Sequence, residues 1–264
     1  MSTNVAMLDI DSLTFQYPAG AKVFRNFSFH ADEGEFVVLL GPSGCGKSTL
    51  LNLLAGFTQP DTGAVKVKGQ SIQPENDVLG YVFQQPHLFG WLSAVENVRF
   101  GLRMRNQISK KQQLAIARQY LDRVGLAHAA DLLPHQMSGG MQQRVSLARA
   151  LALEPKVLLM DEPFAALDAI TRSDMNEETL RLWTALGQTT VFITHDIEEA
   201  VFLADRVIVL NLAPGGIHSE LNIELPRPRS NLETRQLPEF IAYRTELLKR
   251  ISDVMQQLPQ KSSH

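Results

Sequence analysis

A glycine-rich segment at residues 41–49, GPSGCGKST, constrains this chain more than any other feature. It matches the pattern G-x-x-x-x-G-K-[ST] in full. Its glycines let the backbone wrap so that N–H groups point at an anion, and the following helix adds the positive end of its dipole. An apolar run at 35–40 precedes the segment and a stretch of helical composition at 47–55 follows it, as the motif requires. We therefore predict a loop that binds nucleotide phosphates between a buried strand and a helix.

Two side chains of this loop are suited to phosphate chemistry. Lys47 can reach the β- and γ-phosphates as a point charge, and the Ser48 hydroxyl can ligate Mg²⁺. Cys45 lies near a helix N-terminus that could lower the pKa of its thiol, but we interpret it as a loop position without a chemical role. The residues predicted to surround the nucleotide phosphates are Gly41, Pro42, Ser43, Gly44, Cys45, Gly46, Lys47, Ser48 and Thr49.

Length, composition and charge limit the classes of protein to which this chain can belong. The chain has 264 residues, of which 44% are hydrophobic and 20% charged, as in ordinary globular proteins. Its net charge of −3 lacks the basic excess of a nucleic-acid binder, so no nucleic-acid partner is expected. A single cysteine fits a reducing cytoplasm. The first ten residues do not read as a signal peptide, and no apolar run approaches the ~18 residues that span a bilayer. A role at a membrane would therefore need a separate spanning partner.

Strands and helices alternate along most of the chain, which predicts an α/β fold with a mostly parallel sheet covered on both faces. The block at about 86–153 is helical and looks like an inserted subdomain, while residues 226–230, PRPRS, indicate a linker. Hydrophobic periodicity predicts strands at 8–17, 23–29, 35–40, 65–67, 78–83, 157–160, 190–194 and 207–210, and helices at 47–55, 93–103, 109–124, 138–153, 175–186, 197–203 and 239–258.

Two acids follow the predicted strand at 157–160. Asp161 at the carboxyl end of that strand can hold Mg²⁺ through its water shell. Glu162, one residue on, can polarise the water that attacks the γ-phosphate. An isolated Asp-Glu pair is more often a solvated turn, but a phosphate loop in the same sheet favours the catalytic interpretation.

Residues 137–144, MSGGMQQR, lie between these two motifs, and here the sequence resembles the ABC ATPase family. The signature of that family is Leu-Ser-Gly-Gly-Gln at the start of a helix, where small residues expose N–H groups and a hydroxyl to an anion. By this resemblance Ser138, Gly139 and Gly140 contact the ATP that is bound to the phosphate loop of another copy of the chain. A head-to-tail homodimer is therefore implied.

Four more residues match elements of the family in order. Tyr17 corresponds to the aromatic residue that stacks on adenine, although a core side chain at the end of a strand is the alternative. Gln84, chosen over its neighbour Gln85 by its place after a strand, corresponds to the glutamine that touches Mg²⁺ and the attacking water. Asp168 corresponds to the loop that crosses the dimer interface, and His195 to the histidine that contacts the γ-phosphate.

The resemblance covers residues from about 8 to 228 and implies a complete architecture. We expect a P-loop NTPase (RecA-like) core at 1–230 with an N-terminal antiparallel β subdomain and the inserted helical subdomain, followed by a C-terminal helical extension at 231–264. ATP and Mg²⁺ are the implied cofactors. The implied catalytic residues are Glu162, His195, Gln84 and Lys47, and the implied metal ligands are Ser48, Gln84 and Asp161.

Several segments look like the nitrate, sulfonate and taurine group of bacterial importers, namely 91–97, 162–172, 194–206 and 226–229. This resemblance implies uptake of a small solute through integral membrane permease subunits, with a solute-binding protein acting indirectly. The chain itself would lie at the cytoplasmic side of the inner membrane.

An exporter subunit is an alternative, as is an ATPase acting on DNA or ribosomes. The latter proteins carry long coiled coils or tandem cassettes, and this chain has neither.

Overall fold

The computed structural model describes residues 6–18, 20, 22–72, 78–104 and 108–256. The chain divides into two compact units. The first unit joins the two ends of the chain, Met1–Pro74 and Val191–His264. The second unit is the continuous stretch Glu75–Thr190.

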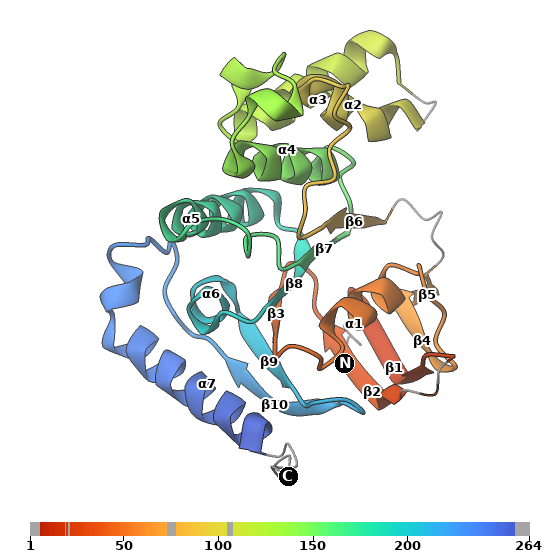
Figure 1. Ribbon diagram of the computed structural model, residues 1–264, viewed down its shortest axis with the longest axis vertical. Coiled ribbons are helices and arrows are strands. Elements are labelled where there is room, and N and C mark those ends of the chain that lie inside the picture. Colours follow the sequence, from red (N-terminus) through yellow and green to blue (C-terminus); the bar gives the residue numbers. More distant parts are fainter. Residues whose placement is uncertain (1–5, 19, 21, 73–77, 105–107, 257–264) are drawn as a thin grey trace, which may run out of the picture. The chain divides into compact units, whose positions relative to one another are not determined.

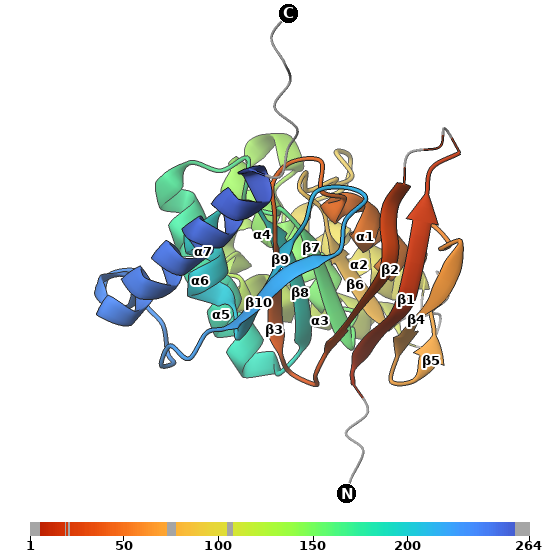
Figure 2. The same ribbon diagram turned by 90° about the horizontal axis from the view of Figure 1, so that it is seen from below.

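An antiparallel sheet forms one part of the first unit (Figures 1 and 2). It consists of β1 (Leu8–Gln16), β2 (Lys22–Ala31), β4 (Thr62–Val67) and β5 (Gln70–Ser71) in the order β2-β1-β4-β5. The apolar residues that alternate along β1 are buried, as period-two spacing requires. The expected N-terminal antiparallel β subdomain is therefore confirmed.

The other strands of the first unit are β3 (Phe36–Leu40), β9 (Arg206–Leu210), β10 (Ile217–Asn222) and β8 (Thr189–Thr194), of which β8 belongs to this unit from Val191 on. Their order is β10-β9-β3-β8. β3 pairs with β9 in parallel and every residue of β3 is buried, which explains its unbroken apolar sequence. β10 pairs with β9 in antiparallel fashion. The sequence patterns did not predict β10, because as an edge strand it buries no residue completely. The helices of this unit are α1 (Lys47–Leu54), α6 (Ile197–Leu203) and α7 (Pro238–Gln256).

In its described residues, the second unit combines two parallel strands with four α-helices. The strands are β6 (Leu79–Val82) and β7 (Val157–Asp161), and the helices are α2 (Ala94–Met104), α3 (Lys110–Arg123), α4 (Gly139–Leu151) and α5 (Ala169–Leu186). α2, α3 and α4 pack on one another (Figure 1). The predicted helix from 175 begins earlier, at Ala169, because the Asp168 side chain accepts bonds from the N–H groups of Ile170 and Thr171 and so caps it.

The C-terminal helix α7 packs against α6 and β9 within the first unit (Figure 2). Arg235 and Arg244 both pair with Glu198 of α6, with N–O distances of 2.7 and 3.2 Å. At the other end of α6 the buried Arg229 donates to the carbonyl oxygens of Phe202 and Ala204, at 2.8 and 2.9 Å. The 226–230 linker and the C-terminal extension together therefore fix both ends of α6. No helix in the described part of the chain is long and apolar enough to cross a membrane.

Candidate nucleotide site

The phosphate loop connects β3 to α1 in the first unit, as the motif predicts. Gly46 ends the loop in the left-handed region, at φ 96°, and a Cβ there would lie 2.6 Å from Val23 Cγ1 and 2.9 Å from Phe24 Cζ. Glycine is therefore required at this position by both backbone conformation and space. The turn that it permits directs the chain into α1 at Lys47.

The Lys47 ammonium lies inside the curve of this loop. Its Nζ donates to the carbonyl oxygens of Gly41 at 2.7 Å and Pro42 at 3.0 Å, and the residue is only 7% exposed. These bonds hold a positive charge at the N-terminal end of α1, where the helix dipole also favours an anion. The Ser48 hydroxyl group belongs to an exposed residue, whereas Cys45 is fully buried and cannot line the loop surface with its thiol.

Tyr17 stands beside the phosphate loop. Its hydroxyl lies 3.0 Å from Thr49 Oγ1, and its ring meets that of Phe15 edge to face with centroids 5.0 Å apart. The side chain is 43% exposed, so it is not the core residue that was the alternative. Stacking of this ring on adenine stays a prediction.

His195 follows β8 and is exposed, although the residues before it are buried. The backbone on either side of it is held by side chains. Thr194 Oγ1 donates to Glu199 Oε2 at 2.5 Å, and Asp196 accepts from the N–H groups of Glu198 and Glu199 at 2.8 and 3.2 Å. The start of α6 is thereby fixed, and with it the position from which the imidazole projects.

Gln84 and Glu162 leave the same edge of the β6–β7 pair in the second unit. The register pairs Val82 with Met160, and each of the two predicted site residues comes two positions later. Glu162 has φ 41°, a left-handed conformation that is costly for a residue with a Cβ and is often found at functional sites. The backbone therefore bends at Glu162, directly after β7.

Asp161 places a negative charge near the partly buried phenol of Tyr81. Burial, and then the charge of Asp161, raise the pKa of Tyr81 well above its ordinary value, so this tyrosine remains neutral at physiological pH. Asp161 itself is partly exposed at the end of β7.

The donors that the sequence predicts for Mg²⁺ fit that ion. The Ser48 hydroxyl, the Gln84 amide and the Asp161 carboxylate supply hard oxygen ligands. Among the described residues there is no group of three or more His, Cys, Asp or Glu that could form a cage from protein groups alone. Mg²⁺ that is held with nucleotide phosphates needs no such cage, because it retains water and phosphate oxygens as ligands.

The signature segment opens α4. Ser138 caps this helix, with its Oγ accepting from the N–H of Met141 at 3.3 Å, and both Ser138 and Gly139 are exposed. A Cβ on Gly140 would lie 2.7 Å from Thr171 Cγ2, so a side chain at this position would disturb the packing of α4. The helix thus presents its first N–H groups and a hydroxyl together, which is an arrangement suited to an anion.

The predicted residues divide between the two units. Asp168, the cap of α5, is exposed, and hydrogen bonds from the backbone and side chain of Thr171 lower the pKa of its carboxyl group. The first unit contains Tyr17, residues 41–49 and His195, and the second contains Gln84, Ser138, Gly139, Gly140, Asp161, Glu162 and Asp168. The roles of all these residues stay predictions.

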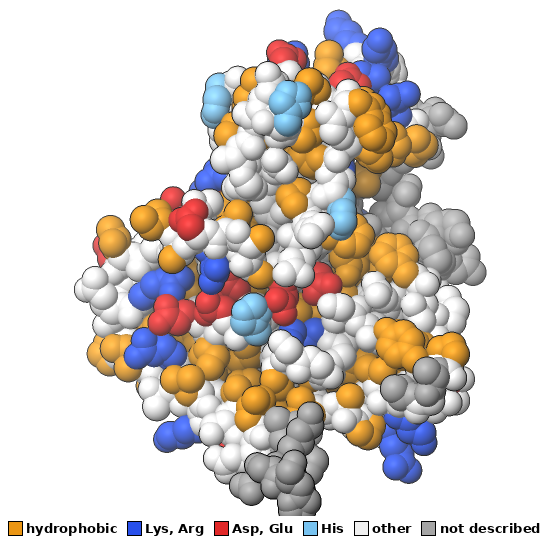
Figure 3. Space-filling view, viewed as in Figure 1, with side chains coloured by type: hydrophobic (Ala, Val, Ile, Leu, Met, Phe, Trp, Pro, Cys, Tyr) orange, Lys and Arg blue, Asp and Glu red, His pale blue; other side chains and the backbone are white. Residues whose placement is uncertain are grey.

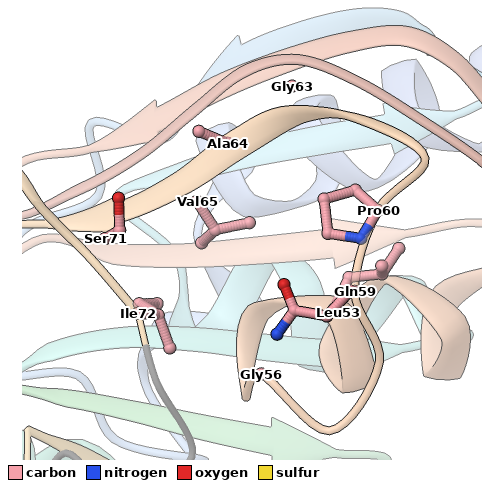
Figure 4. Close-up of a pocket in the computed structure, with 9 residues that line it drawn as sticks. All are labelled: Leu53, Gly56, Gln59, Pro60, Gly63, Ala64, Val65, Ser71 and Ile72. Atoms are coloured by element: carbon pink, nitrogen blue, oxygen red, sulfur yellow. The ribbon is translucent and has the colours of Figure 1, made fainter.

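A separate pocket of about 160 Å³ lies in the first unit near the C-terminal end of α1 (Figure 4). Leu53 of α1 and Val65 of β4 are among the residues that line it, and its polar side chains are those of Gln59 and Ser71. None of its nine lining residues is charged. Because phosphate recognition needs charged or convergent N–H donors, this pocket is unsuited to the nucleotide phosphates.

Comparisons with known proteins agree with these motifs. A sequence profile for the family described as "ABC transporter" matches residues 24–165. The nitrate import ATP-binding protein of Synechocystis sp. is 45% identical over 228 residues, which are 84% of this chain and 85% of that protein. The taurine import ATP-binding protein of Ruegeria pomeroyi is 42% identical over 252 residues, 94% of each.

The fold also matches a solved structure. An ATP-binding cassette, described as the dimeric post-hydrolysis state bound to ADP and Pi, superposes with a TM-score of 0.72 and 33% identity. The match covers 82% of this chain and 99% of that one. The α/β architecture predicted for the sequence is therefore confirmed.

Proposed function

Because the chain belongs to the ABC transporter family as an ATP-hydrolysing subunit, we propose that it powers the import of a small anion through partner permease subunits. The observation that carries the importer assignment is the similarity, over at least 84% of both chains, to ATP-binding proteins named for nitrate and for taurine import. Nitrate is a small oxoanion and taurine carries a sulfonate. We therefore infer a small solute with an anionic oxo group, either an anion of this kind or a related organic compound.

The residues of the two units take complementary roles in this proposal. Lys47 and the N–H groups of the phosphate loop bind the β- and γ-phosphates, while Tyr17 stacks on adenine. Glu162 acts as general base toward the attacking water, and His195 contacts the γ-phosphate. Mg²⁺, held by Ser48, Gln84 and Asp161, would neutralise charge on the phosphate oxygens.

A second copy of the chain completes each site in our proposal. The exposed Ser138 and Gly139 at the start of α4 would bind the ATP held by the partner in a head-to-tail dimer. The dimeric ADP-bound cassette of similar fold supports this assembly. ATP would favour the closed dimer because it makes contacts there that the open state lacks. The dimer would act at the cytoplasmic face of the membrane, bound to its permease.

The proposed permease contact is an apolar surface beside α2. The Trp91 side chain is 78% exposed and Met104 at the end of α2 is 64% exposed. The Phe89 ring links this surface to the helical core, with its centroid 5.5 Å from that of Trp91 and 4.4 Å from that of Phe100. Figure 3 shows hydrophobic side chains gathered on the α2 side of the helical block. Such a surface is suited to a short amphipathic helix of a membrane partner.

Replacing Trp91 and Leu92 by alanine should weaken assembly with the permease about tenfold or more, since an exposed aromatic anchor contributes strongly to an interface. Copurification of the two subunits measures this loss. The isolated subunit should hydrolyse ATP at an unchanged rate. Leu232→Ala is the matched control, because Leu232 is also exposed, at 79%, but lies in the first unit. Intact assembly in the Trp91→Ala/Leu92→Ala variant would contradict the permease contact.

The direction of transport distinguishes import from export. In proteoliposomes that carry the permease with this subunit facing outward, we expect ATP added outside to drive solute out of the lumen, toward the ATP side. The lumen would contain the solute-binding protein with labelled nitrate or taurine. Movement away from the ATP side would establish an exporter, and ATP hydrolysis with neither solute moving would contradict the anion assignment.

A further inference from the structure

Two side chains of α4 hold the backbone on either side of the Gln84–Gln85 pair. Gln143 Nε2 donates to the carbonyl oxygen of Phe83 at 3.1 Å. Arg149 Nη2 and Nη1 donate to the carbonyl oxygens of Pro86 and His87, each at 2.8 Å. The first of these carbonyls directly precedes Gln84 and the second directly follows Gln85.

These contacts are well suited to fixing a segment in place. Gln143 is 2% exposed, so the loss of its amide would leave a carbonyl oxygen without that buried partner. Burial lowers the pKa of Arg149, whose planar guanidinium can bond two successive carbonyls at once. His87 adopts φ 44°, and its ring packs edge to face on Phe83 with centroids 5.3 Å apart. A left-handed histidine persists only where its surroundings determine it strongly.

The same helix holds a second functional segment. Gln142, the neighbour of Gln143, donates to the carbonyl oxygens of Pro134 and Met137 at 2.9 and 3.3 Å, immediately before Ser138. Adjacent glutamines of α4 therefore bond to different loops. Gln142 secures the segment that leads into the signature, whereas Gln143 and Arg149 secure the segment that carries Gln84.

We propose that Gln143 and Arg149 are positioning residues for ATP hydrolysis, which hold Gln84 where it can reach Mg²⁺ and the attacking water. The inference rests on the role proposed above for Gln84. Neither side chain need touch the nucleotide, because both act on the backbone that presents Gln84. Through them, the position of the helix that starts at Ser138 determines the position of Gln84.

A double-mutant cycle tests this proposal on the full chain. Gln143→Ala should lower kcat about tenfold, while the KM for ATP changes less than about twofold because the phosphate loop is untouched. Gln84→Ala should lower kcat about 10²-fold. The Gln84→Ala/Gln143→Ala double variant should be no slower than Gln84→Ala alone, since Gln143 acts only through Gln84. A general structural defect would instead multiply the two losses.

Gln142→Ala is the matched control on the same helix, and its effect should be the same with or without Gln84. Hydrogen exchange on the protein without nucleotide gives a second readout. The amides of Gln84, Gln85 and His87 should exchange faster in Gln143→Ala but not in Gln142→Ala. Arg149→Lys, which keeps a cation able to reach one carbonyl, should retain more turnover than Arg149→Met.

Multiplying losses in the cycle, or unchanged kcat and exchange in Gln143→Ala, would overturn the inference. If Gln84→Ala keeps full turnover while Gln143→Ala does not, the role proposed for Gln84 fails, and the positioning role fails with it. If Gln84→Ala is slow but Gln143→Ala is not, only the positioning role fails. Cooperative thermal unfolding verifies that each variant folds, and Arg149→Lys replaces Gln143→Ala in the cycle if the latter does not.

Discussion

Replacing Lys47 by alanine is expected to weaken ATP binding about 10²-fold or more, because hydrogen bonds from a charged donor are worth about 1.5–3 kcal/mol each. Nζ of Lys47 lies within the loop, bonded to the carbonyl oxygens of Gly41 and Pro42 at 2.7 and 3.0 Å. The substitution removes this positive charge from the position where the β- and γ-phosphates would bind. Titration with a fluorescent ATP analogue measures the dissociation constant.

Lys68→Ala is the control for this experiment. Lys68 belongs to the same unit and pairs with Glu33 at 3.4 Å, but its side chain is half exposed and lies outside the phosphate loop. Its removal should leave ATP affinity unchanged. Wild-type affinity in the Lys47→Ala variant would mean that the loop does not bind phosphate as proposed.

The Glu162→Gln variant should retain ATP binding while its rate of hydrolysis falls by about 10²–10⁴, the usual contribution of a general base. Glutamine preserves the shape of the side chain but cannot accept a proton from water. The strained backbone at Glu162, with φ 41°, indicates that its placement after β7 is specific. Single-turnover release of phosphate, measured alongside ATP affinity, separates chemistry from binding.

Glu154 provides a matched comparison for Glu162. It is also a glutamate with positive φ, at 49°, and it precedes β7 instead of following it. Its carboxylate accepts from the Tyr120 hydroxyl at 3.4 Å, away from the proposed chemistry. Glu154→Gln should therefore hydrolyse ATP at nearly the wild-type rate. Near-normal turnover in Glu162→Gln would refute the general-base role.

The fold could be predicted well wherever one local rule dominates. The phosphate loop needs glycine at position 46 and a buried strand before it, and both features can be recognised in the sequence. The start of α3 follows a similar local rule, because Ser109 caps this helix and forms a full capping box with Gln112. These features depend on residues that are neighbours in the chain.

The rest depends on contacts that leave no pattern in the sequence. The early start of α5 is an exception, because Asp168 is a residue type that favours the N-cap position and so indicates a helix from 169. Gln143 and Arg149 had no such signal, because their partners are backbone carbonyls at Phe83, Pro86 and His87. Any residue type supplies a carbonyl, so only three-dimensional structure reveals that these oxygens lie beside α4.

The discontinuity of the first unit has a consequence for synthesis of the chain on the ribosome. β3 pairs with β9, and the Phe36 N–H bonds to Asp205, which follows 169 residues later. At a translation rate of about 5–20 residues per second, roughly 10–30 s pass between the synthesis of β3 and the synthesis of β9. The second unit is continuous and can be completed first. If the nascent chain stalls before residue 205, the edge of β3 that pairs with β9 stays uncovered. We expect chaperones to bind there, or aggregation to begin there.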